Sequence, residues 1–176
     1  KGCHHSPRVY LWASRAHFDM TFDSCGPHTT SMNEAISFAG KGLRRPWNEQ
    51  DSLLFGGYVD TLRGTVITEI RMLLELKDYH RLQSRLLKYS RISHNEIGKK
   101  HLFGIAQYRV GNETAANEVF AEADSILAQT KRTESWNRHD LTLFQIGAQE
   151  YTAYLEELND SVRLVRFRKI AAPYLK

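Results

Sequence analysis

Proline is almost missing from the greater part of this sequence. The chain of 176 residues has four prolines, and none of them lies between Pro46 and Pro173. Proline interrupts an α-helix more strongly than any other residue, because it lacks the amide proton and its ring clashes with the preceding turn. The long interval without proline therefore permits helices over most of the chain.

Cysteines and long apolar runs are also scarce. Two cysteines, Cys3 and Cys25, are too few for a disulfide framework and are compatible with either redox compartment. No segment approaches the run of about 18 apolar residues that a membrane-spanning helix needs. With 41% hydrophobic and 25% charged residues, the composition is that of a soluble globular protein. The length fits one domain over residues 1–176, and because the chain starts at Lys1 without methionine we expect a processed or excised piece.

Apolar residues recur at intervals of three and four along the interval without proline, which is the period of an α-helix. Turn and capping signals divide the chain into eight predicted helices. These helices cover residues 7–22, 31–41, 50–76, 79–91, 94–110, 113–129, 138–157 and 161–172. The connections after the third, fifth and seventh helices are short, as in antiparallel helix hairpins. The sequence therefore predicts an all-α fold of four hairpins.

Several helix ends carry recognisable signals. Ser31-Met-Asn-Glu34 and Ser93-His-Asn-Glu96 have the capping-box form, in which the serine and the glutamate satisfy free amides at a helix start. Gly111 is predicted to end a helix in a left-handed turn, since glycine adopts that conformation without strain.

Residues 97–130 carry the most specific pattern of the chain. A small residue at Gly104 permits a close helix approach, and Phe120 is expected to fill the space between helix layers. The pattern consists of Phe103, Gly104, Tyr108, Gly111, Ala116, Phe120 and Ala123. It resembles the tetratricopeptide repeat, a helix–turn–helix unit of 34 residues.

The preceding 34 residues, 63–96, match the same repeat in part. Leu82, Leu86 and Tyr89 occupy the places of Ala116, Phe120 and Ala123. Ile70 stands where the small residue is expected, and Lys77 replaces the turn glycine. The outer hairpins match only as helix pairs. A helical bundle without repeats is the alternative interpretation.

The resemblance implies an α-solenoid whose concave groove, lined by the first helix of each pair, binds a protein or peptide. It further implies a scaffold without catalytic activity. The predicted groove residues are Arg71, Glu75, His101, Ile105, Tyr108 and Arg109. Alternatively, Ile105 and Tyr108 pack against the neighbouring hairpin and only Arg109 is exposed. The subtype that clamps chaperone tails is not expected, because Arg71 and Ile105 stand at clamp positions instead of asparagine.

All of the net charge of +4 is in the C-terminal segment 159–176, where five basic residues face one acidic residue. Its basic patch consists of Arg163, Arg166, Arg168 and Lys169. Such a segment can bind nucleic acid or an anionic surface by releasing counterions. A solvated terminal helix of a solenoid is the alternative interpretation. Association of two copies through the terminal hairpins also stays open.

A third class is an all-α metal-binding or hydrolytic protein. Cys3, His4, His5, Cys25 and His28 could hold zinc, although free thiols or a disulfide between the two cysteines are favoured over a zinc site. Arg132 with His139 resembles the arginine–histidine motif of an all-helical ribonuclease family. The sequence has no phosphate loop, nucleophile elbow or paired-carboxylate signature. We therefore predict neither a cofactor nor a metal site, and we favour the scaffold.

Overall fold

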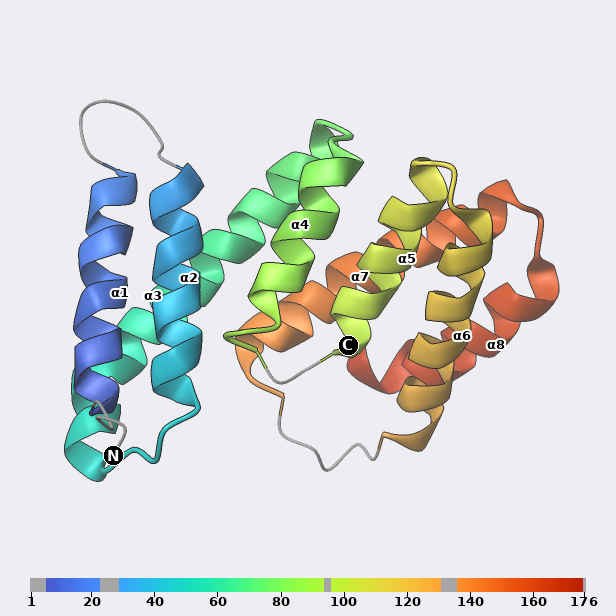
Figure 1. Cartoon of the computed structure of the whole chain (residues 1–176). Helices are drawn as coiled ribbons and strands as arrows, with labels where there is room; N and C mark the ends of the chain where they lie inside the picture. Colours follow the sequence, from blue (N-terminus) through green and yellow to red (C-terminus); the bar gives the residue numbers. More distant parts are fainter. Residues whose placement is uncertain (1–5, 23–28, 94–95, 131–135, 176) are drawn as a thin grey trace. The chain divides into compact units, whose positions relative to one another are not determined.

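The computed structural model describes residues 6–22, 29–93, 96–130 and 136–175 of the chain. These residues form helices and connections without any strand (Figure 1). The helices are α1 (Pro7–Thr21), α2 (Thr29–Leu43), α3 (Glu49–Glu75), α4 (Tyr79–Tyr89), α5 (Ile97–Arg109), α6 (Glu113–Gln129), α7 (Arg138–Glu157), α8 (Ser161–Ala171) and the 3₁₀ turn η1 (Ala172–Tyr174). The all-α prediction is confirmed, and each predicted helix is found within three residues of its expected ends.

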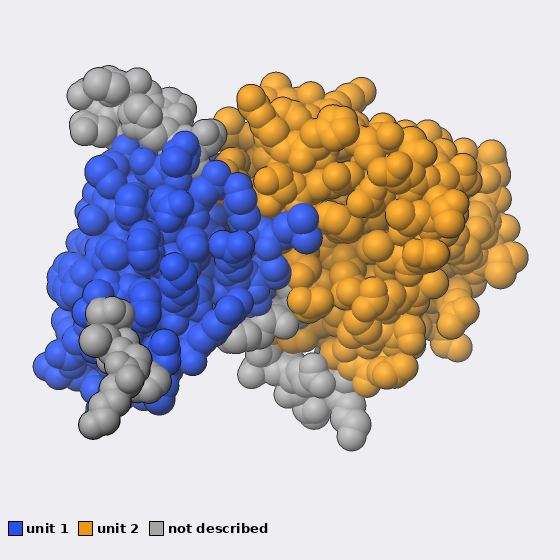
Figure 2. Space-filling view, viewed as in Figure 1, with its two compact units in different colours: residues 1–68, 87–94 blue, residues 69–86, 95–176 orange. Residues whose placement is uncertain are grey.

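Within the described residues, no helix is long and apolar enough to cross a membrane. The chain divides into two compact units, which Figure 2 shows in different colours. Unit 1 comprises residues 1–68 and 87–94, and unit 2 comprises residues 69–86 and 95–176. Helices α3 and α4 each contribute residues to both units. The single domain over 1–176 stays a prediction.

Unit 1 is built on the antiparallel pair α1 and α2 together with the first part of α3 (Figure 1). Leu11 of α1 is buried against Phe55 and Val59 of α3. At the edge of this core, the Arg8 guanidinium lies 2.6 Å from the Asp51 carboxylate. The hydrogen bond from Arg8 lowers the pKa of Asp51 below its usual value. An apolar core and an ion pair therefore both join α1 to α3.

The capping box predicted at Ser31 is wrong, and the one predicted at Ser93 includes His94 and Asn95, which lie outside the described residues. Helix α2 begins at Thr29, so Ser31 lies inside the helix. The reciprocal cap is found at α3. Asp51 N donates to Asn48 Oδ1 over 2.8 Å, and Asn48 N donates to Asp51 Oδ2 over 3.3 Å. This arrangement satisfies free amides at the helix start.

Three helix hairpins turn in the same way. After α3, α5 and α7, one residue has a positive φ: 57° at Lys77, 89° at Gly111 and 54° at Asn159. Each turn has the hydrogen-bond pair of a Schellman motif, as when Asp78 N donates to Leu73 O and Lys77 N donates to Leu74 O. The left-handed turn predicted at Gly111 is confirmed. Lys77 adopts the same conformation 34 residues earlier, although it carries a side chain.

We expect Lys77→Gly to stabilise the protein by about 0.5–1 kcal/mol, because a residue with a Cβ is strained in the left-handed region and glycine is not. The midpoint of urea unfolding, monitored by circular dichroism, measures this change. Asn159→Gly serves as the comparison and should gain less, since asparagine tolerates this conformation better than lysine. An unchanged or lower midpoint for Lys77→Gly would show that the lysine is not strained.

Unit 2 is organised by close helix contacts at glycines. A Cβ on Gly104 would lie 2.4 Å from the ring of Phe120, so α5 and α6 approach each other as the sequence predicts. A Cβ on Gly98 would lie 2.4 Å from the Phe144 Cα, and one on Gly147 would lie 2.7 Å from the Gly98 carbonyl oxygen. The α5–α7 contact is therefore made by backbone against backbone.

Candidate functional site

A pocket in unit 1 combines four residues of α2 with one residue that follows α4. Ser37, Gly40, Lys41 and Arg44 line it from α2, and Arg91 completes it. The intervals of three and four residues place the α2 positions on one side of the helix. The cavity has a volume of about 280 Å³. No carboxylate and no apolar side chain belongs to its lining.

Glycine at position 40 lets the chain that follows α4 rest directly on α2. A Cβ at this position would lie 2.8 Å from the Arg91 carbonyl oxygen and 2.9 Å from the Arg91 Cβ. The turn is also held from α3, where Arg63 Nε donates to the Ile92 carbonyl oxygen over 2.6 Å. Two independent contacts therefore position the backbone of Arg91.

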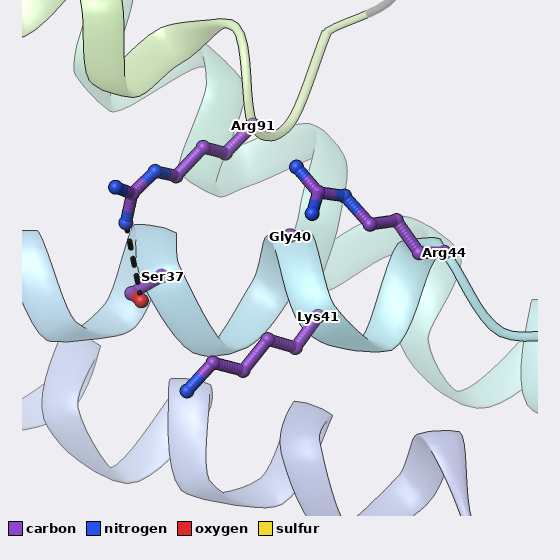
Figure 3. Close-up of a pocket in the computed structure, with 5 residues that line it drawn as sticks. All are labelled: Ser37, Gly40, Lys41, Arg44 and Arg91. Carbon is purple, nitrogen blue, oxygen red and sulfur yellow. Dashed lines mark hydrogen bonds between the residues drawn. The ribbon is translucent and has the colours of Figure 1, made fainter.

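The cationic side chains reach the pocket from two directions. Figure 3 shows the guanidinium of Arg91 over Ser37 and that of Arg44 over Gly40, on the same side of α2. Arg91 Nη1 donates to Ser37 Oγ over 3.3 Å. Lys41 extends toward α1 (Figure 3), and its ammonium lies 5.0 Å from the centre of the Phe38 ring. Lys41 therefore stands at the rim, and the two arginines stand over the pocket.

The charge of this pocket is uncompensated by other described side chains. No carboxylate of the described residues lies within ion-pair distance of Lys41, Arg44 or Arg91, although several other arginines and lysines have such partners. The carbonyl ends of α2 and α4 contribute about half a negative charge each, against three positive side chains. The local potential is therefore positive and favours an anion.

None of the five pocket residues belongs to a functional motif that the sequence predicts. The spacing of Ser37, Gly40, Lys41 and Arg44 was available as a signal, but the predicted helix ended at residue 41 and the observed one continues to Leu43. Arg91 lies about fifty residues further along the chain, so only the tertiary structure could place it here.

The predicted groove residues divide into buried and exposed ones. His101 is 0% exposed and Ile105 is 2% exposed, so neither side chain reaches the surface. Tyr108 is half-buried, with its ring centre 4.8 Å from that of Tyr154. Arg109 is bound by both carboxylate oxygens of Glu157. The prediction that His101 and Ile105 are exposed in a binding groove is therefore wrong.

Arg71 and Glu75 lie exposed near the end of α3, and their part in a groove stays a prediction. Arg109 is the member of the predicted groove with the best-defined contact, since its guanidinium joins α5 to α7 through Glu157. The hydrogen bond with Glu157 raises the pKa of Arg109 and lowers that of Glu157. This pair is exposed, so solvent weakens its effect on stability.

His101 belongs instead to a polar network in the core of unit 2. Its Nε2 lies 3.1 Å from Asp124 Oδ1, and its Nδ1 lies 3.2 Å from the Ile97 carbonyl oxygen. The Tyr151 hydroxyl donates to Asp124 Oδ2 over 3.2 Å and accepts from Arg163 Nη2 over 3.0 Å. Burial raises the pKa of Tyr151. The network joins α5, α6, α7 and α8, and its histidine is enclosed rather than placed to meet a substrate.

The predicted basic patch is also partly engaged within unit 2. Arg163 takes part in the network, and Arg168 lies 2.6 Å from the carboxylate of Glu156. Arg166 and Lys169 are exposed on α8. The four residues therefore do not form one free cationic surface, and binding of nucleic acid or an anionic surface there stays a prediction.

Among the described residues, no three His, Cys, Asp or Glu side chains are grouped as a metal site requires. The residues considered as zinc ligands, Cys3, His4, His5, Cys25 and His28, lie outside the described residues, as does Arg132. His139 is described, and its Nε2 accepts from Arg138 Nε over 3.4 Å. The described residues therefore add no metal ligand and no catalytic partner to the metal and ribonuclease hypotheses.

Comparison of the chain with protein-family models, with curated proteins and with solved structures found no match. The function proposed below therefore rests on the residues and the structure of this chain.

Proposed function

We propose that this protein is a non-catalytic binding scaffold of helical-repeat type, and that the pocket of unit 1 binds an anionic group of its protein or peptide ligand. The repeat character is supported by the 34-residue spacing of the left-handed turns at Lys77 and Gly111. It is also supported by complete burial of corresponding positions in the two proposed repeats. These positions are Leu82, Leu86 and Tyr89 in one repeat and Ala116, Phe120 and Ala123 in the other.

The observation that carries the proposal is the lining of the pocket. Two arginines lie over a hydroxyl and a glycine, with a lysine at the rim and no carboxylate in the lining. Cations placed together repel one another, and an anion bound between them relieves that repulsion while accepting charge-assisted hydrogen bonds. A buried arginine is paired in this chain, as Arg85 is with Glu69 at 2.6 Å. Arg44 and Arg91 are instead exposed, and Arg91 meets the Ser37 hydroxyl and no carboxylate.

The proposal is tested by thermal unfolding of the whole chain in acetate, citrate, sulfate or phosphate, with ionic strength held constant by chloride. An anion at ten times its Kd stabilises by about 1.4 kcal/mol, which is about 3–5 °C for a chain of this size. We expect such a shift with at least one of these anions in the wild type. The double variant Arg44→Ala, Arg91→Ala should lose it.

Arg45→Ala is the matched control, because Arg45 is an exposed neighbour of Arg44 that does not line the pocket. It removes one positive charge beside the pocket and should keep the anion-dependent shift. Sulfate and phosphate also stabilise proteins by exclusion from their surface. Equal shifts in the wild type and in both variants would therefore be non-specific, and they would contradict anion binding in the pocket.

A further inference from the structure

The pocket of unit 1 has a composition that selects among anions. It offers the two guanidinium groups of Arg44 and Arg91 and the Ser37 hydroxyl group, while the Lys41 ammonium lies at its rim. A guanidinium presents parallel N–H donors that match two oxygens of one anion, so two of them can engage three or more oxygens. A carboxylate has two oxygens and one charge. A phosphomonoester has three terminal oxygens and close to two charges at neutral pH.

The size and lining of the pocket also limit which part of a ligand can enter it. A volume of about 280 Å³ lies just below the range of about 300–1,000 Å³ usual for sites that enclose a whole small molecule. No aromatic or aliphatic side chain lines it, so a nucleobase would find nothing to stack on. The pocket therefore suits a charged head group whose remaining atoms stay outside.

We infer that the pocket binds a phosphomonoester displayed on a peptide, such as a phosphorylated serine side chain of a partner protein. Recognition of phosphorylated segments by clustered arginines is a general mode of peptide binding. Arg44 and Arg91 would hold the phosphate oxygens from two sides. Ser37, which already accepts a hydrogen bond from Arg91, orients that guanidinium. Gly40 leaves the surface between them open. This inference rests on the proposed function, because it assigns the ligand of the same pocket.

Three capped peptides with the sequence Gly-X-Gly test the inference, where X is phosphoserine, glutamate or serine. Isothermal titration with the full chain measures their affinities. We expect the phosphoserine peptide to bind about ten times more tightly than the glutamate peptide, and the serine peptide not to bind, since each added charge-assisted hydrogen bond is worth about that factor. Arg44→Ala and Arg91→Ala should each weaken binding about tenfold or more.

Lysine substitutions separate charge from geometry. Arg44→Lys and Arg91→Lys keep the positive charge but lose the paired donors, so they should bind more weakly than the wild type and more tightly than the alanine variants. Arg45→Ala should change the affinity by less than about twofold, as expected for an exposed charge beside the site. Equal helicity by circular dichroism shows that the variants are folded.

The outcomes distinguish the inference from the proposed function. Equal binding of the phosphoserine and glutamate peptides, with loss in the arginine variants, would overturn the preference for phosphate and leave an anion-binding scaffold. Binding to vesicles that contain a phosphomonoester lipid, without binding of the phosphoserine peptide, would overturn the assignment to a peptide. If neither peptides nor inorganic anions show a dependence on Arg44 and Arg91, both proposals fail.

Discussion

Gly98→Ala is expected to lower the free energy of unfolding of unit 2 by about 3 kcal/mol, at the upper end of the usual cost of overpacking. The added methyl group would lie 2.4 Å from the Cα and 2.5 Å from the backbone nitrogen of Phe144. Both atoms belong to the backbone of α7, so a change of side-chain rotamer cannot relieve the clash. The helices α5 and α7 would have to move apart and lose the packing around Phe144.

Urea unfolding monitored by circular dichroism and by tryptophan fluorescence measures this effect, because the half-buried Trp136 lies against Phe144 in unit 2. Gly56→Ala is the matched control. Gly56 also lies inside a helix, but a Cβ there would meet nothing within 4 Å. The free energy of unfolding of this variant should rise by about 0.5–1 kcal/mol, since alanine favours the helix more than glycine does. Stability of Gly98→Ala equal to that of the wild type would contradict the close α5–α7 contact.

Asp124→Ala is also expected to lower the free energy of unfolding by about 3 kcal/mol. Asp124 is the acceptor for Nε2 of the fully buried His101 and for the Tyr151 hydroxyl. Removing the carboxylate leaves both groups without this partner inside the core, and a buried polar group without a hydrogen bond is costly. The substitution should also weaken the contact between α7 and α8, because the Tyr151 hydroxyl accepts a hydrogen bond from Arg163 on α8.

The unfolding midpoint of Asp124→Ala in urea measures the loss, and Asp124→Asn is its control. The amide keeps the shape of the side chain and one acceptor oxygen, so about half of the loss is expected. Glu156→Ala, which removes the partner of Arg168 on the surface, should cost less than about 1 kcal/mol. A loss below about 1 kcal/mol for Asp124→Ala would show that the network contributes little to the stability of unit 2.

The helical class and the helix limits follow from local features of the sequence. The apolar period, the scarcity of proline and the turn signal at Gly111 act over a few residues, so they are visible without a fold. The close approach at Gly104 was also predictable, because Gly104 and Phe120 occupy the small and the large positions of the pattern in residues 97–130. The start of α2 was not predictable, since the four-residue pattern at Ser31 lies inside the helix and does not mark its first turn.

The placement of the functional residues depended on contacts between distant segments. His101 was expected in a groove and instead lies in the core, because Asp124 on α6 and Tyr151 on α7 enclose it and supply its partners. The periodicity of one helix cannot tell which of its polar residues meets a buried partner from another helix.

What the sequence determined by itself is an all-α chain with hairpin turns at defined positions, because the hydrophobic period and the signals for these turns are local. What only the tertiary structure decided is the candidate site. Gly40 and Arg91 come together because a glycine on α2 admits the backbone that follows α4, and that contact brings Arg91 to Ser37 and Arg44. A concentration of charge from distant segments is a property of the folded chain, since the unfolded chain keeps those residues apart.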